Sequence, residues 1–375
     1  MARLGDVCTV VSGTTPKSNH SGYWDGNLNW VTPAELTDES DTIYETQRKI
    51  TSQAVIDSSL KSFPAGTVLL SSRAPIGKVA IAGTEMYCNQ GFKNLICSEK
   101  IYNRYLYHFL KNKTAYLNSL GRGATFKEIS KSIVENIEIP LPSLEEQREI
   151  AAVLDKVSDL IAKRRQQLEK LDLLVKARFT EMFGEEKERK TISDICSIIT
   201  DGTHQPPKFV SEGIPFLFVS NLVSNEITFE TDKFITQETY NDLIKRTPIE
   251  EGDILLSTVG SYGHPAIVKN NKKFLFQRHI AYLKPKHDVI CSEYLHSALL
   301  SQEAQRQIQK KVKGVAQKTL NLSEIRKISI PIPIMEKQIQ FCIFVKQIEK
   351  TKTEIKNSLA KLEILKKALM QEYFG

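Results

Sequence analysis

Two proline pairs divide this chain into regions of different character: Ile139-Pro140-Leu141-Pro142 and Ile330-Pro331-Ile332-Pro333. Each pair is followed by about 40 residues that contain neither glycine nor proline. After the first pair, Ser143 precedes two acidic residues, Glu145 and Glu146. A serine cap followed by acidic side chains is typical of a helix start, because it satisfies exposed N–H groups and the positive end of the helix dipole. The sequence therefore predicts a long helix after each proline pair.

Both expected helices carry an apolar repeat with heptad spacing. In the first helix the repeating positions, spaced alternately by four and three residues, are Ile150, Leu154, Val157, Ile161, Arg164, Leu168, Leu171, Val175, Arg178 and Met182. The equivalent positions 191 residues later are Phe341, Val345, Ile348, Lys352, Ile355, Leu359, Leu362, Lys366, Leu369 and Tyr373. Eight of the ten positions in each set are apolar or aromatic, which indicates a coiled-coil seam over five heptads. About 39 helical residues at 1.5 Å each give a length of roughly 58 Å.

Each helix needs a partner, because a helix with such an apolar stripe in water is not stable alone. An antiparallel pair within the chain is favoured, since the partner in the same chain has the higher effective concentration. That arrangement places two globular regions at opposite ends of the pair. Homodimerisation through parallel coils is the alternative.

The regions before the two helices also repeat. Three segments match at offsets of about 186–191 residues: 4–8 with 192–196, 66–71 with 252–257, and 77–81 with 263–267. Both copies end in Phe-Gly, at 183–184 and 374–375. Repeats of this length indicate duplicated domains, because solenoid units are much shorter.

We predict an α+β (mixed α/β) fold from these patterns. Short β-rich runs alternate with turn clusters of Gly, Pro, Asn and Ser in each globular region. The expected organisation is two tandem globular domains, separated by two long helices that pair as an antiparallel coiled coil, with a pseudo-twofold internal repeat. The predicted segments are a first domain at 1–142, a first helix at 143–183, a second domain at 184–333 and a second helix at 334–375.

Composition excludes several classes of protein. The 375 residues carry a net charge of +7, and the whole excess lies in residues 189–375, which permits a polyanionic partner. Apolar runs such as 341–345 are too short for a membrane span, and the N-terminus lacks the features of a signal peptide. The six cysteines form no Cys-x-x-Cys pair, so we expect thiols in a reducing cytoplasm and no metal site.

The sequence contains no recognisable active site. Residues 72–79 lack the first glycine and the final hydroxyl of a phosphate-binding loop, and Gly121-Arg122-Gly123 has too few glycines for a dinucleotide motif. Residues 205–208 differ from the Asn/Asp-Pro-Pro-aromatic motif of amino-methyltransferases. The seven histidines are scattered, and no catalytic residue is predicted.

Polar loops that recur once per repeat are the candidate functional sites. Arg, Asn and Gln side chains read base edges, whereas Lys, Ser and Thr hold phosphates, so we predict contacts to DNA. Ordinary polar turns are the alternative for any single residue. The candidates are Thr14, Thr15, Lys17, Arg73, Lys78, Gln90, Lys93, Arg122, Thr125 and Lys127 in the first repeat, and Thr203, His204, Lys208, Ser257, His264, Gln277, Arg278, His279, Lys313, Gln317 and Lys318 in the second.

The chain resembles the specificity (S) subunit of type I restriction-modification systems over its whole length. The resemblance rests on the order and duplication of several motifs: the opening at 4–7 with Ser-Gly-Thr-Thr-Pro at 12–16, Tyr23-Trp24 and Trp30, the Gly-Asp-Ile-Leu-Leu-Ser strand at 252–257, and the Ile-Pro-Leu-Pro-x-x-x-Glu-Gln junction at 139–147. One departure is the second junction, where Met335-Glu336-Lys337-Gln338 is less typical.

This resemblance implies a subunit without catalytic activity that acts in the cytoplasm. Two target-recognition domains would each read one half of a split sequence in double-stranded DNA. The long helices would act as spacers and dock two methyltransferase (M) subunits, and restriction/translocase (R) subunits would complete the complex. S-adenosylmethionine, ATP and Mg²⁺ would bind to these partners and not to this chain.

Three other functions remain open from the sequence. The chain could serve a related methyltransferase system that has no nuclease. A coiled-coil scaffold would explain the helices but not the duplicated polar loops. A stand-alone enzyme acting on nucleic acid would need motifs that we do not find.

Overall fold

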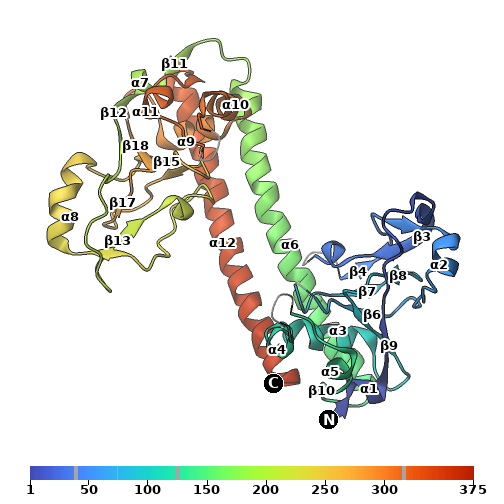
Figure 1. The fold of residues 1–375 in the computed structure, drawn as a ribbon. Helices are drawn as coiled ribbons and strands as arrows, with labels where there is room; N and C mark the ends of the chain where they lie inside the picture. Colours follow the sequence, from blue (N-terminus) through green and yellow to red (C-terminus); the bar gives the residue numbers. More distant parts are fainter. Residues whose placement is uncertain (38–40, 74, 124–126, 315–317) are drawn as a thin grey trace. The chain divides into compact units, whose positions relative to one another are not determined.

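The computed structural model describes residues 1–37, 41–73, 75–123, 127–314 and 318–375. The chain forms two compact units: unit 1 comprises residues 1–166 and 357–375, and unit 2 comprises residues 167–356. Two long helices, α6 (Leu144–Phe183) and α12 (Met335–Phe374), each contribute residues to both units and are green and red in Figure 1. A long helix therefore follows each proline pair, as predicted.

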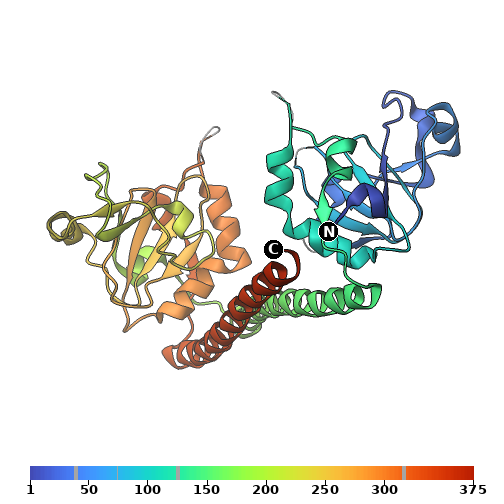
Figure 2. The same cartoon turned by 90° about the horizontal axis from the view of Figure 1, so that it is seen from below.

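Unit 1 gathers its strands and short helices in the blue and teal region of Figure 2. Its described strands are β1 (Ala2–Arg3), β2 (Cys8–Ser12), β3 (Trp24–Val31), β4 (Thr42–Ile43), β5 (Lys49–Ile50), β6 (Val68–Leu70), β7 (Val79–Ala82), β8 (Tyr87–Cys88), β9 (Lys93–Cys97) and β10 (Glu138–Ile139). Its short helices are α1 (Leu4–Val7), α2 (Ser52–Asp57), α3 (Asn103–Asn112), α4 (Thr114–Leu120) and α5 (Lys131–Glu135), with 3-10 turns η1 (Ser21–Tyr23) and η2 (Pro33–Glu35).

Unit 2 contains a similar series of elements. Its described strands are β11 (Arg189–Thr191), β12 (Cys196–Asp201), β13 (Ile214–Leu217), β14 (Phe234–Ile235), β15 (Ile254–Ser257), β16 (Pro265–Ile267), β17 (Leu275–Phe276), β18 (Ile280–Pro285) and β19 (Ser329–Pro331). Its short helices are α7 (Ile192–Ile195), α8 (Gln237–Leu243), α9 (Ser292–Leu300), α10 (Gln302–Lys311) and α11 (Leu322–Ile325), with 3-10 turns η3 (Val219–Asn221) and η4 (Ile244–Arg246).

The two units share the strand order of their sheets, except that β4 of unit 1 has no counterpart among the described strands of unit 2. The main sheet has the order β2-β9-β6-β7-β4 in unit 1 and β12-β18-β15-β16 in unit 2, within the described residues. A smaller sheet has the order β5-β3-β8 in unit 1 and β14-β13-β17 in unit 2. A short antiparallel pair, β1 with β10 and β11 with β19, joins the beginning and the end of each globular region. The duplication and the mixed α/β class inferred from the sequence are thus confirmed.

The main sheet of unit 1 is buried on both faces. Neighbouring residues of a strand point to opposite faces, so Val68 and Leu70 pack in a cluster with helix α3, whereas Leu69 packs in a cluster with Phe63 on the other face. This explains why the strand sequence is continuously apolar and does not alternate. Helix α3 in turn packs against the long helices, where the ring of Tyr105 lies 5.1 Å from that of Phe374.

The long helices run antiparallel within each unit. In unit 1, Arg165 of α6 forms an ion pair of 2.8 Å with Glu363 of α12, and the earlier Leu154 of α6 shares a buried cluster with the later Met370 of α12. In unit 2, Asp172 of α6 pairs with Lys352 of α12 at 2.9 Å, and further along the rings of Phe179 and Phe341 lie 5.6 Å apart. Later residues of α6 thus lie beside earlier residues of α12. The expected antiparallel pairing within the chain is confirmed.

The apolar seam departs from strict heptad spacing near the end of each helix. Leu154 and Phe341 are buried at the beginnings, as expected. At the ends, however, the side chains buried most deeply are Phe179, Phe183, Met370 and Phe374, whereas Arg178 is exposed. A straight helix has 3.6 residues per turn, so a strict heptad stripe drifts by about 20° per heptad around it. The buried position has accordingly moved by one residue, in the same way in both helices.

The four segments predicted from the sequence, 1–142, 143–183, 184–333 and 334–375, remain a prediction, because the compact units cut across both helices. Among the described residues, no helix combines the length and the hydropathy that a membrane span requires. The six cysteines are free, and burial raises the pKa of the Cys88 and Cys196 thiols to about 12.

Candidate nucleic-acid interface

Four polar loops of unit 1 lie at one edge of its main sheet. Strands β2 and β6 end at this edge, and their antiparallel neighbours β9 and β7 begin there. The described residues of these loops, which we number L1 to L4, are 13–17, 71–73 with 75–78, 89–92, and 121–123 with 127–129. The backbone N–H of Thr14 donates to the carbonyl of Cys88 at 3.1 Å, and Ser72 N–H donates to Gly91 at 2.7 Å. Because Ile129 N–H donates to the Ser72 carbonyl at 3.0 Å, the loops form one connected surface.

Unit 2 builds the same edge with the same backbone bonds. The described residues of its equivalent loops are 202–208, 257–264, 277–279, and 313–314 with 318–320. Thr203 N–H donates to the Phe276 carbonyl at 2.9 Å, and Thr258 N–H donates to His279 at 2.9 Å. Leu320 N–H donates to the Thr258 carbonyl at 2.8 Å. The framework is therefore duplicated although most loop side chains differ.

Each edge contains a glycine where two backbones come very close. A Cβ atom at Gly13 would lie 2.1 Å from the carbonyl oxygen of Cys88. At Gly202 it would lie 2.3 Å from the carbonyl oxygen of Phe276. Such distances are far below a van der Waals contact, so only glycine allows L1 to meet L3. The Gly-Thr pairs in the sequence serve this approach.

A buried serine accepts a hydrogen bond that closes the loop after β6 in unit 1 and the loop after β15 in unit 2. Ser71 Oγ accepts a hydrogen bond from Lys78 N–H at 2.8 Å, and Ser257 Oγ accepts one from His264 N–H at 3.0 Å. Both loops turn through a glycine with positive φ, Gly77 at 90° and Gly263 at 83°. Ser257 therefore shapes its loop from inside and does not lie on the surface.

An ion cluster joins L2, L4 and strand β9 in unit 1. Glu128 accepts hydrogen bonds from Arg73 at 2.9 Å and from Lys93 at 3.0 Å. Burial by itself would raise the pKa of Glu128, but these two cations outweigh it and hold that pKa below its usual value. The side chain of Lys93 is only 9% exposed, whereas that of Arg73 is 45% exposed. Lys93 thus acts within the cluster, and Arg73 presents the accessible charge.

A model of the type I restriction modification DNA specificity domain matches residues 1–171 and 184–365. The MjaIX type I restriction enzyme specificity subunit of Methanocaldococcus jannaschii is 32% identical over 365 residues, covering 89% of this chain and 84% of that protein.

The chain belongs to the type I restriction-modification specificity subunit family.

One further relative is similar in sequence, and two solved structures are similar in fold. The EcoBI specificity subunit of Escherichia coli is 25% identical over 325 residues, covering 76% of this chain and 68% of that protein. The type I S subunit of M. genitalium matches the fold with a TM-score of 0.60, at 16% identity, over 100% of this chain and 95% of that one. A chain from a study of assembly and conformational transition of a type I R-M system gives a TM-score of 0.58 at 20% identity, covering 99% and 96%.

Most of the loop residues predicted for this specificity subunit lie on the surface of the two edges. Exposed positions are Thr14, Lys17, Arg73, Gln90, Arg122, Lys127, His204, Lys208, Arg278, Lys313 and Lys318. Half-buried positions are Thr15, Lys78, Thr203, His264, Gln277 and His279. Lys93 and Ser257 are buried, and Thr125 and Gln317 lie outside the described residues. Contacts to DNA at all of these positions stay a prediction.

The structure also brings residues to the edges that the sequence did not suggest. In unit 2, Arg246 forms an ion pair with Asp201, whose other oxygen lies 3.0 Å from His204. Arg246 is 42 residues from His204 in the chain, so no local motif linked them. In unit 1, the indole N–H of Trp24 donates to the Lys17 carbonyl at 3.3 Å.

Two tryptophans, Trp24 and Trp30, donate hydrogen bonds to backbone carbonyls of L1. The Trp30 indole N–H donates to the Thr14 carbonyl at 3.5 Å, and the rings of Trp24 and Trp30 meet at 5.0 Å. The Arg48 guanidinium lies 3.8 Å from the Trp24 ring centre. This cation–π contact leaves Arg48 exposed beside the loop. Both tryptophans contribute to the family resemblance in the sequence, but their loop contacts follow only from the fold.

The described loops of the specificity subunit offer hydrogen-bond donors and positive charge. Within the part of the chain that the structure describes, no three His, Cys, Asp or Glu side chains are placed to hold a metal ion. Arginine, glutamine and lysine side chains suit contacts to base edges and phosphates. The arrangement is suited to recognition of a polyanion.

Proposed function

We propose that this specificity subunit reads a bipartite sequence in double-stranded DNA, with the loop edge of each unit contacting one half-site. The observation that carries the proposal is the same four-loop framework built twice with different side chains. A common backbone frame supports docking against the phosphates in the same manner, whereas different side chains support different base contacts. Recognition of two unlike half-sites follows from such a design.

The partners of the proposed complex are M subunits, which bind S-adenosylmethionine, and R subunits, which use ATP and Mg²⁺. The long helices offer a duplicated surface for the M subunits. Leu173 and Leu174 on α6 are 62% and 46% exposed, and the equivalent Ile364 and Leu365 on α12 are 70% and 46% exposed. Lysines stand at equivalent flanking positions, which are Lys170 and Lys176 on α6 and Lys361 and Lys367 on α12. Two copies of one apolar surface with basic flanks fit two copies of one partner.

A map of methylated bases in host DNA tests the proposed function. The chain is expressed with its M partner, or the M partner is expressed alone. We expect a split motif to be methylated only when both proteins are present. Methylation of the same motif by the M partner alone would contradict the proposal.

A second measurement separates this subunit from a stand-alone methyltransferase. Calorimetry of S-adenosylmethionine with the purified chain should give no binding, and the chain with its partner should bind it. Stoichiometric binding to the isolated chain would favour the enzyme. Adding the R subunit to the complex and assaying cleavage distinguishes the restriction system from a related methyltransferase without a nuclease.

A further inference from the structure

An ion pair links each globular region to a long helix, and its polarity is reversed between the repeats. In unit 1, Arg104 of α3 donates to Asp155 of α6 through Nε at 2.9 Å and through a second nitrogen at 2.5 Å. In unit 2, Lys346 of α12 pairs with Glu293 of α9 at 3.1 Å. The cation thus lies on the short helix in one repeat and on the long helix in the other.

Neighbouring contacts show that these pairs occupy equivalent places. Tyr105 follows Arg104 and donates to the Pro140 carbonyl at 3.1 Å, and Tyr294 follows Glu293 and donates to the Pro331 carbonyl at 2.9 Å. On the long helices, positions 155 and 346 are separated by the same 191 residues that separate the two proline pairs. The charges differ, but the geometry of the contact is retained.

In unit 1, two further side chains contact the Arg104–Asp155 pair. Arg104 also contacts Asp41 at 2.7 Å, and Asp155 accepts a hydrogen bond from His108 at 2.6 Å. Burial alone would raise the pKa of Asp155, but His108 and Arg104 outweigh it and lower that pKa. Asp155 is therefore held as a carboxylate between two partners on α3. A bidentate pair of this kind restricts direction as well as distance.

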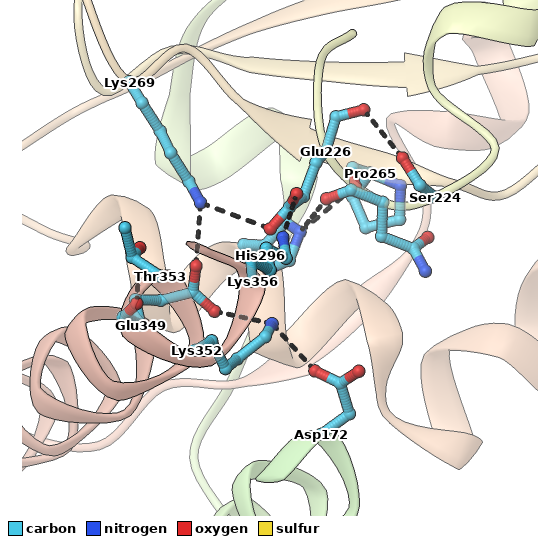
Figure 3. A network of polar contacts seen from close by, with 11 residues as sticks. Asp172, Ser224, Glu226, Pro265, Lys269, His296, Glu349, Lys352, Thr353 and Lys356 are labelled. Carbon is cyan, nitrogen blue, oxygen red and sulfur yellow. Dashed lines mark hydrogen bonds and ion pairs between the residues drawn. The ribbon is translucent and has the colours of Figure 1, made fainter. Parts of the chain in front are cut away.

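In unit 2 the lysine of the pair is more exposed, and a separate network, which Figure 3 shows, also joins the globular region to α12. Lys269 reaches Glu349 of α12 at 2.8 Å, and Glu226 accepts from Lys356 of α12 at 2.8 Å. Although burial by itself would raise the pKa of Glu349, Lys269 and Lys352 lower it to about 2. These bridges join loops of the globular region to the same helix that carries Lys346.

We infer that Arg104–Asp155 and Glu293–Lys346 are positioning contacts that set the angle of each globular region, and hence of its loop edge, on the long helix. The inference rests on the proposed function, since the angle matters through the separation of the two half-sites. If the charge of the long helix at this position were the requirement, its sign would be the same in both repeats, but it is negative at Asp155 and positive at Lys346. Both repeats keep an ion pair at this place although the cation and the anion are exchanged. The property that they share is therefore a direct link between the short helix and the long helix.

The test exchanges the cation and the anion of the Arg104–Asp155 pair, so that the first repeat carries the charges of the second. The repulsive variant carries Asp41→Asn and Asp155→Lys, which sets a lysine side chain against Arg104. The transplanted variant adds Arg104→Glu and His108→Ser, which installs the groups found at Glu293, Ser297 and Lys346. Asp159→Lys, at an exposed site of α6, is the matched control for charge reversal.

Each variant is assembled with the M partner, and methylation is measured on DNA with fixed half-sites and a varied spacer. We expect wild type, control and transplanted variant to prefer one spacer length. The repulsive variant should lose about tenfold at that length and gain at neighbouring lengths, with both half-sites unchanged. The melting temperature of each chain is measured alongside.

Two results would overturn the inference: an unchanged spacer preference in the repulsive variant, or a transplanted variant that folds but does not recover. Lower stability with an unchanged spacer preference would likewise show a structural role only. Absence of split-site methylation by the wild-type complex would instead contradict the proposed function.

Discussion

Two buried glutamines fasten the long helices to the globular regions. Gln147 of α6 donates to the carbonyls of Lys100 and Pro142 at 3.1 and 3.0 Å and accepts from Tyr102 N–H at 2.8 Å. Gln338 of α12 makes the same three bonds with Val289, Pro333 and Cys291. Each side chain thus satisfies three backbone groups at once, and no other residue type of this size has both donor and acceptor in the required places.

Replacing either glutamine should destabilise the chain. Gln147→Ala leaves buried backbone groups without partners, so we expect a loss of about 1–3 kcal/mol in the free energy of unfolding. Gln338→Ala should lose a similar amount, whereas Gln166→Ala, at an exposed site of α6, should have little effect. Urea denaturation of each variant gives the comparison. Equal stability of Gln147→Ala and Gln166→Ala would contradict this role.

A buried histidine predicts how stability depends on pH. His296 Nε2 lies 3.2 Å from the Asn225 carbonyl and 3.1 Å from that of Pro265, which requires an N–H donor. Burial lowers the pKa of His296 despite these two acceptors. The unfolded chain therefore binds this proton more readily, and stability is lost as the pH falls below the unfolded pKa of about 6.5.

Unfolding free energies at pH 7.5 and 5.5 test this linkage. The difference should be smaller in His296→Gln, because a glutamine amide donates to the same carbonyls without titrating. His287→Gln, at an exposed site, is the control. An identical difference in wild type and His296→Gln would show that His296 does not contribute.

At the scale of elements, local patterns predicted the helices and the duplication but not the details of their packing. The sequence places the first helix at 143–183, and α6 covers Leu144–Phe183, because a long stretch without Gly or Pro and with a heptad stripe favours one continuous helix. The shift of the buried positions to Phe179 and Phe374 was missed, because a heptad pattern alone does not show whether the two helices supercoil or stay straight. Lys352 breaks the seam in the sequence, but in the fold it pairs with Asp172 and Glu349.

The loop edges were predicted less completely than the helices. Repeated segments identified the positions of these loops: Gly-Thr recurs at 13–14 and 202–203, and Gly-Thr-Val-Leu-Leu-Ser at 66–71 matches Gly-Asp-Ile-Leu-Leu-Ser at 252–257. Burial of Lys93 and Ser257 could not be predicted, since it depends on loops that are distant in sequence. Arg246 was missed for the same reason. Contacts between residues far apart in the chain are set by tertiary packing and not by local pattern.

The exposed apolar pairs on the helices predict the stoichiometry of the complex. Leu173→Ser/Leu174→Ser should leave the melting temperature of the chain unchanged, because both side chains are exposed, but should reduce the bound M subunits from two to one. Leu160→Ser is the matched control: Leu160 is also exposed, but its equivalent is Thr351, so no duplicated surface is involved. Native mass spectrometry counts the subunits. Two bound M subunits of unchanged affinity would exclude this surface.

At the scale of the whole molecule, the helices should act as a ruler for the two half-sites. Deleting 162–168 of α6 together with 357–363 of α12 removes one heptad from each, keeps the seam in phase and retains the exposed Ile364 and Leu365. Seven residues correspond to about 10 Å of helix, or roughly three base-pair steps of 3.4 Å. We expect the preferred spacer to shorten by about one to three base pairs, since DNA bends and twists. An unchanged spacer in a stable, active variant would mean that the helices do not set it.

Independent reading of two half-sites is the central claim, and exchange of one globular region tests it most directly. Residues 1–142 are replaced by the corresponding region of another family member with a different target, and the hybrid is expressed with the M partner. Methylated bases in the host DNA are then mapped. We expect one half of the motif to change to that of the donor, while the other half and the spacer stay the same. A change in both halves, or in neither, would contradict independent reading.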